Sequence, residues 1–289
     1  EHPRDWEACL SELRAATLEH RNELVDGATE IFLWQTLAAT WSLPGTAAGA
    51  HPISRERLHG YLTKAMREAK THTSWTDPDH AYEEAIFALA DEALVNAQVA
   101  SALDAFTALS AESVRAAILG QKLLQLTMPG VPDLYQGCEV VDLSLVDPDN
   151  RREVDFYRCS GMLASIDEGA ISGLDAEKLR VVSQALRLRR SRPEAFHGEQ
   201  AAYRPVATTS GHAIAFSRGV ADETVAISVA TRLPASLAER EGWGEHTLFL
   251  PEGRWRDLLS GAEVDGGQTP IAEILTTWPV ALLVPADHS

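Results

Sequence analysis

The sequence predicts an α+β chain of three parts: a helical block over residues 1–127, a strand, loop and helix over residues 128–200, and antiparallel strands over residues 201–289. Apolar residues recur three and four positions apart in the first part, whereas apolar and polar residues alternate in the last. Between them, the segment from Val131 to Tyr135 is short enough to be a buried strand and is followed by polar residues. Hydrophobic residues make up 45% and charged residues 23% of the chain, which is typical of a folded globular protein.

Capping residues predict where the helices of the first part begin. Asp26 and Ser54 each precede a run with helical spacing, so each is expected to cap a helix. Asp77, followed by a proline that suits the first helical position, predicts another start. The pattern that follows is long for one helix, so we expect a break near Asn96, and Ser110 is expected to open the next helix.

Polar groups directly follow the predicted strand at 131–135. Gln136 and Glu139 come first, and the run Asp147-Pro-Asp-Asn-Arg-Arg152 comes next. Strand ends are where α/β barrels place the groups that contact a substrate. We therefore expect a substrate-binding loop here.

The remainder of the chain changes from one helix to strands. The helix is expected to begin at Asp175 and to be ended by Arg192-Pro193. Strand-like segments separated by Gly, Pro and Asp turns occupy residues 212–216, 224–229, 246–250, 255–259 and 280–284. These short strands predict a C-terminal antiparallel β-sandwich domain over residues 201–289.

Charge and composition restrict the partners. A net charge of −17 argues against nucleic acid, because phosphate binding draws on Lys and Arg, and it is compatible with a neutral sugar. No apolar run approaches the roughly 18 residues of a membrane span, so no membrane partner is expected. The three cysteines are irregularly spaced, which fits a reducing, cytoplasmic location better than a disulfide framework.

Five separated segments together carry a resemblance to a known family. They are Ile31-Phe-Leu-Trp-Gln-Thr-Leu37 with Trp41, Lys70-Thr-His-Thr-Ser-Trp-Thr-Asp-Pro-Asp79, Met128-Pro-Gly-Val-Pro-Asp-Leu-Tyr-Gln-Gly-Cys-Glu139 with Asp142 to Arg152, Gly242-Trp-Gly-Glu245 with Leu250-Pro-Glu-Gly-Arg-Trp-Arg-Asp257, and Leu275-Thr-Thr-Trp-Pro-Val-Ala-Leu-Leu283. The chain resembles the α-amylase family of glycoside hydrolases and, more narrowly, the malto-oligosyltrehalose synthases. It departs from the family pattern at Cys138 and Glu153.

The resemblance implies a fold and an activity. Residues 128–200 would hold the last strand and helix of a (β/α)8 barrel, with residues 1–127 as a helical insertion region of that barrel. The enzymes convert the reducing-end α-1,4 linkage of maltodextrins into an α,α-1,1 trehalose linkage by intramolecular transglucosylation. The family's catalytic carboxylates would lie upstream of Glu1, so we assign no catalytic residue here. We expect a C-terminal part of an isomerase that is inactive alone, meets maltodextrin through an N-terminal catalytic part, and uses no cofactor.

The resemblance also implies candidate contacts with the sugar. They are Lys70, His72, Trp75, Gln136, Glu139, Asp147, Asp149, Asn150, Arg151 and Arg152. Sugar hydroxyls both donate and accept hydrogen bonds, which carboxylates, amides and guanidinium groups can satisfy, and an exposed indole can stack on a pyranose ring.

Each candidate also has a purely structural interpretation. Asp147 to Asn150 has the composition of a solvated turn, and Arg151 and Arg152 could instead pair with Asp147, Asp149 or Asp155 to hold the loop. Lys70 and His72 could cap helix carbonyls, and Trp75 could belong to the core. His72, Asp77 and His80 match no zinc pattern, so no metal site is predicted.

Two other functions stay open on the sequence. The chain could belong to another α-amylase-family glucanotransferase or hydrolase, which product analysis of the full-length protein would reveal. It could also be a carbohydrate-binding module without chemistry, which the intact mass of the native protein would separate from a part of a longer enzyme.

Overall fold

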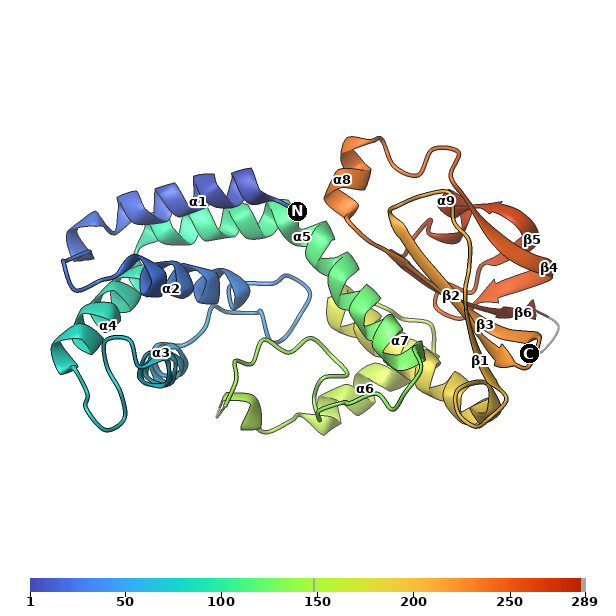
Figure 1. The fold of residues 1–289 in the computed structure, drawn as a ribbon, viewed down its shortest axis with the longest axis horizontal. Helices are drawn as coiled ribbons and strands as arrows, with labels where there is room; N and C mark the ends of the chain where they lie inside the picture. Colours follow the sequence, from blue (N-terminus) through green and yellow to red (C-terminus); the bar gives the residue numbers. More distant parts are fainter. Residues whose placement is uncertain (148, 287–289) are drawn as a thin grey trace. The chain divides into compact units, whose positions relative to one another are not determined.

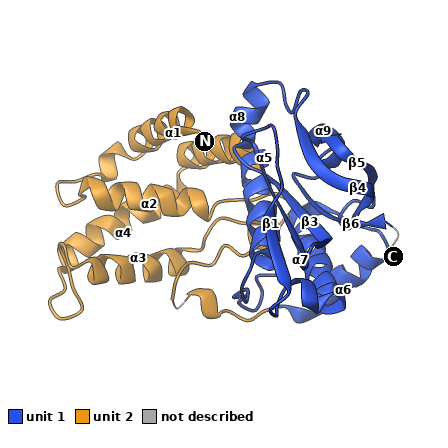
Figure 2. Cartoon of the chain, turned by 45° about the vertical axis from the view of Figure 1, so that its right-hand side comes forward, with its two compact units in different colours: residues 1, 112–141, 155–289 blue, residues 2–111, 142–154 orange. Residues whose placement is uncertain are grey.

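The structure is a computed structural model that describes residues 1–147 and 149–286. It divides into two compact units, coloured in Figure 2. The helical unit comprises residues 2–111 and 142–154, and the sheet unit comprises residue 1, residues 112–141 and the chain from residue 155 onward. The predicted parts, with boundaries at 127 and 200, are each continuous in sequence. The observed helical unit is not continuous, because residues 142–154 belong to it although they follow part of the sheet unit.

The helical unit is built from packed helices (Figure 1). They are α1 (Pro3–Ala16), η1 (Leu18–His20), α2 (Gly27–Ala39), α3 (Arg55–Ala69), α4 (His80–Val95), the first part of α5 (Ala97–Thr127), and η2 (Asp149–Arg151). The predicted caps of α2 and α3 are confirmed, since Asp26 accepts from the amides of Ala28 and Thr29 and Ser54 accepts from that of Arg57. The predicted cap at Asp77 is wrong. Asp79 caps α4 instead, because its carboxylate reaches the Tyr82 amide at 3.0 Å.

The expected break near Asn96 is confirmed. Asn96 ends α4, and its Oδ1 accepts from the amides of Gln98 and Val99 at 2.8 and 3.2 Å, which starts α5. The expected start at Ser110 is wrong, because α5 is continuous there and the Ser110 hydroxyl bonds back to the Phe106 carbonyl at 2.9 Å. Among the described residues no single helix is long and apolar enough to span a membrane, although α4 and α5, bent by 72°, pass that test as a pair.

The core of the helical unit lies among its helices. Trp34 and Trp41 are buried in it, at 0% and 5% exposure, which confirms the expectation that both belong to the core. Along α1 and α5, the rings of Trp6 and Phe106 pack with centroids 5.3 Å apart. Leu145, from the returning segment 142–154, packs against the same core, so apolar burial helps to fix that loop.

The sheet unit combines helices with one antiparallel sheet. Besides the end of α5, it holds α6 (Phe156–Asp167), α7 (Gly173–Ser191), η3 (Pro193–Ala195), α8 (Pro234–Glu239) and α9 (Ile271–Ile274), with strands β1 (Ala201–Pro205), β2 (Ala213–Val220), β3 (Glu223–Thr231), β4 (Thr247–Asp257), β5 (Glu263–Pro270) and β6 (Val280–Pro285). The strands follow the order β1-β2-β3-β6-β4-β5, and every pair is antiparallel.

This single sheet corrects the predicted β-sandwich. Alternating polarity predicts which side chains face a core, but it does not predict how many sheets the strands form. Here β6 pairs with β3 through Ala230↔Val280 and with β4 through Asp257↔Leu283, so the two groups of strands join into one sheet. The antiparallel arrangement itself is confirmed.

Residues 131–135 do not form a buried strand among the residues that the structure describes. The segment has no regular secondary structure and joins no sheet, and Val131 and Tyr135 are 96% and 61% exposed. Its described side-chain anchor is Gln125, whose Nε2 donates to the Asp133 carbonyl at 2.7 Å. A segment becomes a strand only when a neighbouring strand satisfies its backbone groups, and the described residues place no strand beside this one.

Candidate functional site

The loop 142–154 is held in the helical unit by a bidentate ion pair. Arg57 of α3 donates from Nε and Nη2 to the two carboxylate oxygens of Asp149 at 2.7 and 2.8 Å, and its Nη2 also reaches the Leu143 carbonyl at 3.1 Å. The Leu145 amide donates to the same carboxylate at 2.8 Å. Burial acts to raise the pKa of Asp149, but hydrogen bonds from Arg57 and Leu145 and the charges of Arg57 and Arg152 outweigh it and hold the pKa below its ordinary value.

Asp149 therefore stabilises the conformation of this loop. Its side chain is 8% exposed, and its oxygens accept from Arg57 and from the loop backbone. Arg152 closes the loop in a similar way, because it donates to the Asp149 carbonyl at 3.1 Å and to the Ser144 hydroxyl at 2.8 Å. The loop-holding interpretation of these two residues is what the structure shows, while contact with a sugar stays a prediction.

The other loop candidates lie on its outer side. Asp147, Asn150 and Arg151 are exposed, and Arg151 pairs with Asp147 at 3.1 Å with side chains 73% and 52% exposed. A surface ion pair of this kind contributes little to stability. Asp147 and Arg151 can therefore exchange each other for sugar hydroxyls at small cost, and the exposed Asn150 is accessible to the same ligand.

The second candidate segment, residues 70–79, is built on the buried carboxylate of Glu83. Arg67 donates to both oxygens of Glu83 at 2.7 and 2.8 Å, and the Thr73 hydroxyl donates to one of them at 2.7 Å. The hydrogen bond from Arg67 is the main cause that holds the pKa of Glu83 below its ordinary value, against the effect of burial. Thr73 in turn accepts from the Asp79 amide at 2.9 Å, so the loop is tied at its middle to the start of α4.

The candidate side chains of residues 70–79 lie outside the hydrogen-bonded group of Arg67, Thr73 and Glu83. Lys70 is exposed and ends α3 with a left-handed backbone, φ 57°, while its amide bonds to the Met66 carbonyl. Trp75 is 56% exposed, so the core interpretation is wrong; the Arg67 guanidinium lies over its ring at 5.0 Å from the centroid. Lys70 and Trp75 are thus accessible to a ligand.

His72 belongs to a cluster with Asp26 and Tyr82. Its ring packs on Tyr82 with centroids 4.7 Å apart, and its Nε2 lies 3.7 Å from an Asp26 oxygen. The Tyr82 hydroxyl donates to Asp26 at 2.8 Å. Partial burial acts to raise the pKa of Asp26, but hydrogen bonds from Thr29, Tyr82 and Ala28 lower it to about 2. Burial, with the Asp26 contact, raises the pKa of Tyr82 to about 12.

The two candidate segments lie at opposite ends of α3. Arg57, which holds the loop 142–154, is in the first turn of the helix, and Lys70 directly follows its last turn. Thirteen residues at 1.5 Å each separate them by about 20 Å along the axis. The structure thus does not bring the two segments together at one point. One elongated chain, such as a glucan of several units, could still contact both.

Gln136 and Glu139 belong to the sheet unit, in a turn that follows residues 131–135. Gln136 is exposed, Glu139 is half-buried, and the Cys138 amide bonds to the Tyr135 carbonyl at 3.1 Å. Burial lowers the pKa of the nearby Lys122, and the charges of Cys138 and Glu139 act in the opposite direction.

Spacing along the chain does not identify the residues that organise these two segments. Arg57 lies 92 positions from Asp149, and Arg67 lies 16 from Glu83, so spacing alone could not pair them. A polar residue on the inner face of a predicted helix was the available hint, because a buried charge needs a partner. Among the described residues, no group of three or more His, Cys, Asp or Glu side chains could hold a metal ion.

Comparison with known proteins shows which proteins the chain is similar to. No family model matches it. A protein from two strains of Mycobacterium tuberculosis, named as a maltooligosyl trehalose synthase, is 40% identical over 262 residues, which are 90% of this chain and 32% of the relative. The chain thus spans about one third of the length of the curated relatives it matches.

Solved structures agree with this similarity. The maltooligosyltrehalose synthase of Arthrobacter ramosus matches with a TM-score of 0.82 and 39% identity, covering 98% of this chain and 35% of that one. A hypothetical maltooligosyl trehalose synthase of Sulfolobus tokodaii, at 23% identity and a TM-score of 0.72, covers 98% of this chain and 35% of that one, and shows the shared fold alone. By sequence and by fold, the chain corresponds to about the C-terminal third of the maltooligosyl trehalose synthases.

Proposed function

We propose that this chain is the C-terminal part of an isomerase that converts the reducing-end α-1,4 linkage of a maltodextrin into an α,α-1,1 trehalose linkage. The observation that carries the proposal is the similarity over nearly the whole chain, 39% identity across 98% of its residues at a TM-score of 0.82, to a maltooligosyltrehalose synthase. The candidate residues support it through their chemistry, because exposed indole, amide, carboxylate and guanidinium groups suit a neutral, hydroxyl-rich substrate.

The catalytic carboxylates would come from the part of the relatives that this chain does not span. A retaining mechanism needs two carboxyl groups about 5 Å apart across the scissile bond, and we assign no such pair here. The exposure of Val131 and Tyr135 supports a related proposal, that residues 131–135 are the last strand of a (β/α)8 barrel whose neighbouring strands lie in that other part. Such neighbours would satisfy the free backbone groups of the segment.

Within this enzyme, the residues of this chain would hold the glucan rather than cleave it. Trp75 is proposed to stack on a glucose ring, and Asp147, Asn150 and Arg151 are proposed to bond hydroxyls, with Lys70, His72, Gln136 and Glu139 as further contacts. Asp149 and Arg152 would keep the loop in position. The reaction requires that the released glucose stay bound and turn before its anomeric hydroxyl attacks, so a tight grip protects the intermediate from water.

Product analysis tests the proposal. The full-length protein, incubated with maltopentaose, is expected to consume reducing ends without releasing much glucose, and its product should show a 1,1 linkage by NMR. This chain alone is expected to leave maltopentaose unchanged, because without the catalytic carboxylates the transition state is not stabilised. Hydrolysis or 1,4 transfer by the full-length protein would point to another α-amylase-family enzyme. Turnover by the purified chain would contradict the assignment of catalysis to the remainder.

The loop contacts have their own test in the full-length protein. Arg151→Ala is expected to leave the melting temperature nearly unchanged, because its ion pair is exposed, and to lower kcat/KM by about one to two decades if the guanidinium bonds the substrate in the transition state. Arg152→Ala, which opens the loop, is expected to lower the melting temperature as well. Unchanged kcat/KM in Arg151→Ala would remove Arg151 from the substrate contacts.

A further inference from the structure

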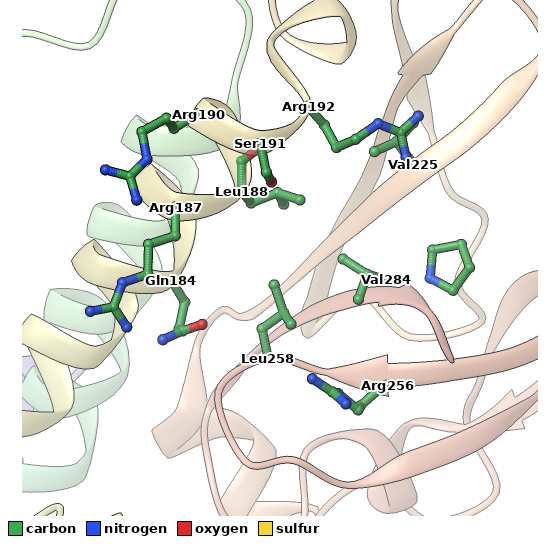
Figure 3. Close-up of a pocket in the computed structure, with 11 residues that line it drawn as sticks. Gln184, Arg187, Leu188, Arg190, Ser191, Arg192, Val225, Arg256, Leu258 and Val284 are labelled. Atoms are coloured by element: carbon green, nitrogen blue, oxygen red, sulfur yellow. The ribbon is translucent and has the colours of Figure 1, made fainter. Parts of the chain in front are cut away.

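The sheet unit contains a cavity of about 470 Å³ beside the C-terminal part of α7 (Figure 3). Its walls come from α7 and from strands β3, β4 and β6 with the residues that follow them. The wall is braced, because Arg180 of α7 donates to the Leu258 carbonyl at 2.7 Å and the Leu258 amide donates to the Leu282 carbonyl at 2.9 Å. This volume lies within the range of small-molecule sites.

The charge of the cavity is its distinguishing property. Four arginines line it, namely Arg187, Arg190 and Arg192 from the end of α7 and Arg256 from β4, and none of its described lining residues is acidic. This concentration of positive charge occurs in a chain whose net charge is −17. A helix end accounts for part of it, because cations near a C-terminus offset the helix dipole, but that does not explain Arg256 on a strand.

Two of the arginines already have carboxylate partners outside the cavity. Arg187 bonds both oxygens of Asp167 at 2.6 and 2.7 Å, and Arg192 bonds Glu194 at 2.7 Å. Each still contributes positive charge near the cavity, although its hydrogen bonds are largely committed.

Arg190 and Arg256 are different, because neither forms an ion pair with any residue that the structure describes. The β-ladder places Arg256 opposite Val284 on β6 and opposite Glu263 on β5, but the Glu263 carboxylate is bonded to Arg254 at 3.1 Å. Figure 3 shows the Arg256 side chain beside Leu258, with Gln184 and Leu188 of α7 on the other side of the cavity. The half-buried Arg256 therefore presents its donors where a ligand could accept them.

We propose that this cavity binds the phosphate group of a small phosphorylated metabolite. A guanidinium matches a phosphate with two parallel hydrogen bonds, and Arg256 is positioned to supply them. Leu188, Leu258 and Val284 form an apolar surface beside it for the carbon skeleton of the ligand. A neutral glucan has no partner for this charge, so the inference goes beyond the proposed function and does not depend on it.

Calorimetric titration of the protein at constant ionic strength tests the proposal with three probes. Glucose 6-phosphate and inorganic phosphate are expected to bind, and glucose is not. Equal affinity for the two phosphates would identify the free anion as the ligand, and tighter binding of glucose 6-phosphate would identify a sugar phosphate. Failure of both phosphates to bind would overturn the proposal.

Three substitutions locate the binding. Arg256→Gln removes the central donor and is expected to weaken phosphate binding about tenfold or more. Gln184→Glu keeps the shape of the wall but adds a negative charge to it, and is expected to weaken binding by at least as much. Arg240→Gln is the matched control, because it removes the same charge from the exposed end of α8 and should leave binding unchanged. Equal affinity in all three variants and the unmodified protein would show that phosphate binds elsewhere.

Discussion

At the scale of single residues, the pairing of Arg57 with Asp149 shows how a distant helix residue can shape a candidate binding loop. The carboxylate is 8% exposed and the guanidinium 23% exposed, so little solvent screens them. The predicted sugar contact at Asp149 identified the correct loop. It did not include the ion pair with Arg57, which already occupies the Asp149 carboxylate. The residues left for a ligand are the neighbours whose side chains point outward.

This pairing predicts a large stability difference between two arginines of α3. Arg57→Ala is expected to lower the free energy of unfolding by about 2–3 kcal/mol, because it leaves a buried carboxylate without its partner. Arg55→Ala is the matched control: Arg55 also bonds a carboxylate, Asp91, but its side chain is 70% exposed, so the loss should stay within about 1 kcal/mol. Urea denaturation of both variants measures the difference, and equal losses would show that the loop is held mainly by other contacts.

The depressed pKa of Asp26 predicts how its contribution depends on pH. Because its pKa is about 2 in the folded chain and 3.8 ordinarily, the stabilisation is present above about pH 4 and is lost as pH falls towards 2. At most, this pKa difference adds about 2 kcal/mol to the free energy of unfolding. We expect the difference in unfolding free energy between the protein and Asp26→Asn to be largest near pH 5 and to shrink below pH 4.

The control for this experiment is Asp77→Asn, which alters an exposed carboxyl group in the nearby segment 70–79. Its difference from the unmodified protein should change little over the same pH range. A difference for Asp26→Asn that stays constant from pH 5 to pH 2.5 would contradict the role of the Asp26 hydrogen bonds.

At the scale of elements, Asn96 separates two helices by serving both of them. Its side-chain oxygen caps α5, and its Nδ2 donates to the Ala16 carbonyl at 3.2 Å and to Glu92 at 2.8 Å. Asn96→Ala is expected to destabilise the protein by about 1 kcal/mol or somewhat more, because it removes the cap and the link to Ala16. Asn96→Asp keeps the acceptor for the cap and should lose less. Guanidinium denaturation compares the two. Equal losses would mean that the link to Ala16 outweighs the cap, and a greater loss in Asn96→Asp would mean that repulsion between its carboxylate and Glu92 dominates.

The sequence predicted elements well where local chemistry determines them. The caps at Asp26 and Ser54 and the break at Asn96 depend on side chains that bond their own backbone neighbours, and all three are confirmed. Strand β5 was not predicted, because Glu263–Pro270 has two central glycines and no apolar alternation. Gly266 allows the close approach of two strands, because a Cβ on it would lie 2.1 Å from the Pro251 carbonyl oxygen of β4.

At the scale of the whole molecule, the sequence predicted the composition of each part but not its long-range partners. The helical first part, the later strands and the family resemblance follow from patterns along the chain. The return of residues 142–154 to the helical unit depends on Arg57, and the merging of the strands into one sheet depends on β6. Such pairings join positions far apart in sequence, and periodicity holds no information about them.

The central place of β6 predicts that its removal breaks the main link in the sheet, because only the bridge between Thr208 and Leu248 would then join the two groups of described strands. Val280, Leu282 and Leu283 are at most 1% exposed, and each contributes about 1.5–3 kcal/mol by burial, which together rivals the net stability of a typical domain. A chain that ends at Trp278 is expected to lose its cooperative thermal transition in the near-ultraviolet circular dichroism of the sheet unit. A chain that ends at Ala286 is the control and should keep the transition. A normal transition in the shorter chain would show that the other strands form a stable sheet without β6.

The position of β6 also has a consequence for the order of events during synthesis. Strands β1, β2 and β3 can pair as soon as they are made, and so can β4 and β5, since each group joins neighbours along the chain. The strand that pairs with both β3 and β4 follows all of them in sequence, so a ribosome must finish Val280–Pro285 before the ladder between β3 and β4 is complete. Until then the nascent protein exposes the edges of β3 and β4, which are open to pairing with other chains. The interval between the synthesis of β4 and that of β6 is therefore when we expect the unfinished sheet to be most prone to wrong pairing.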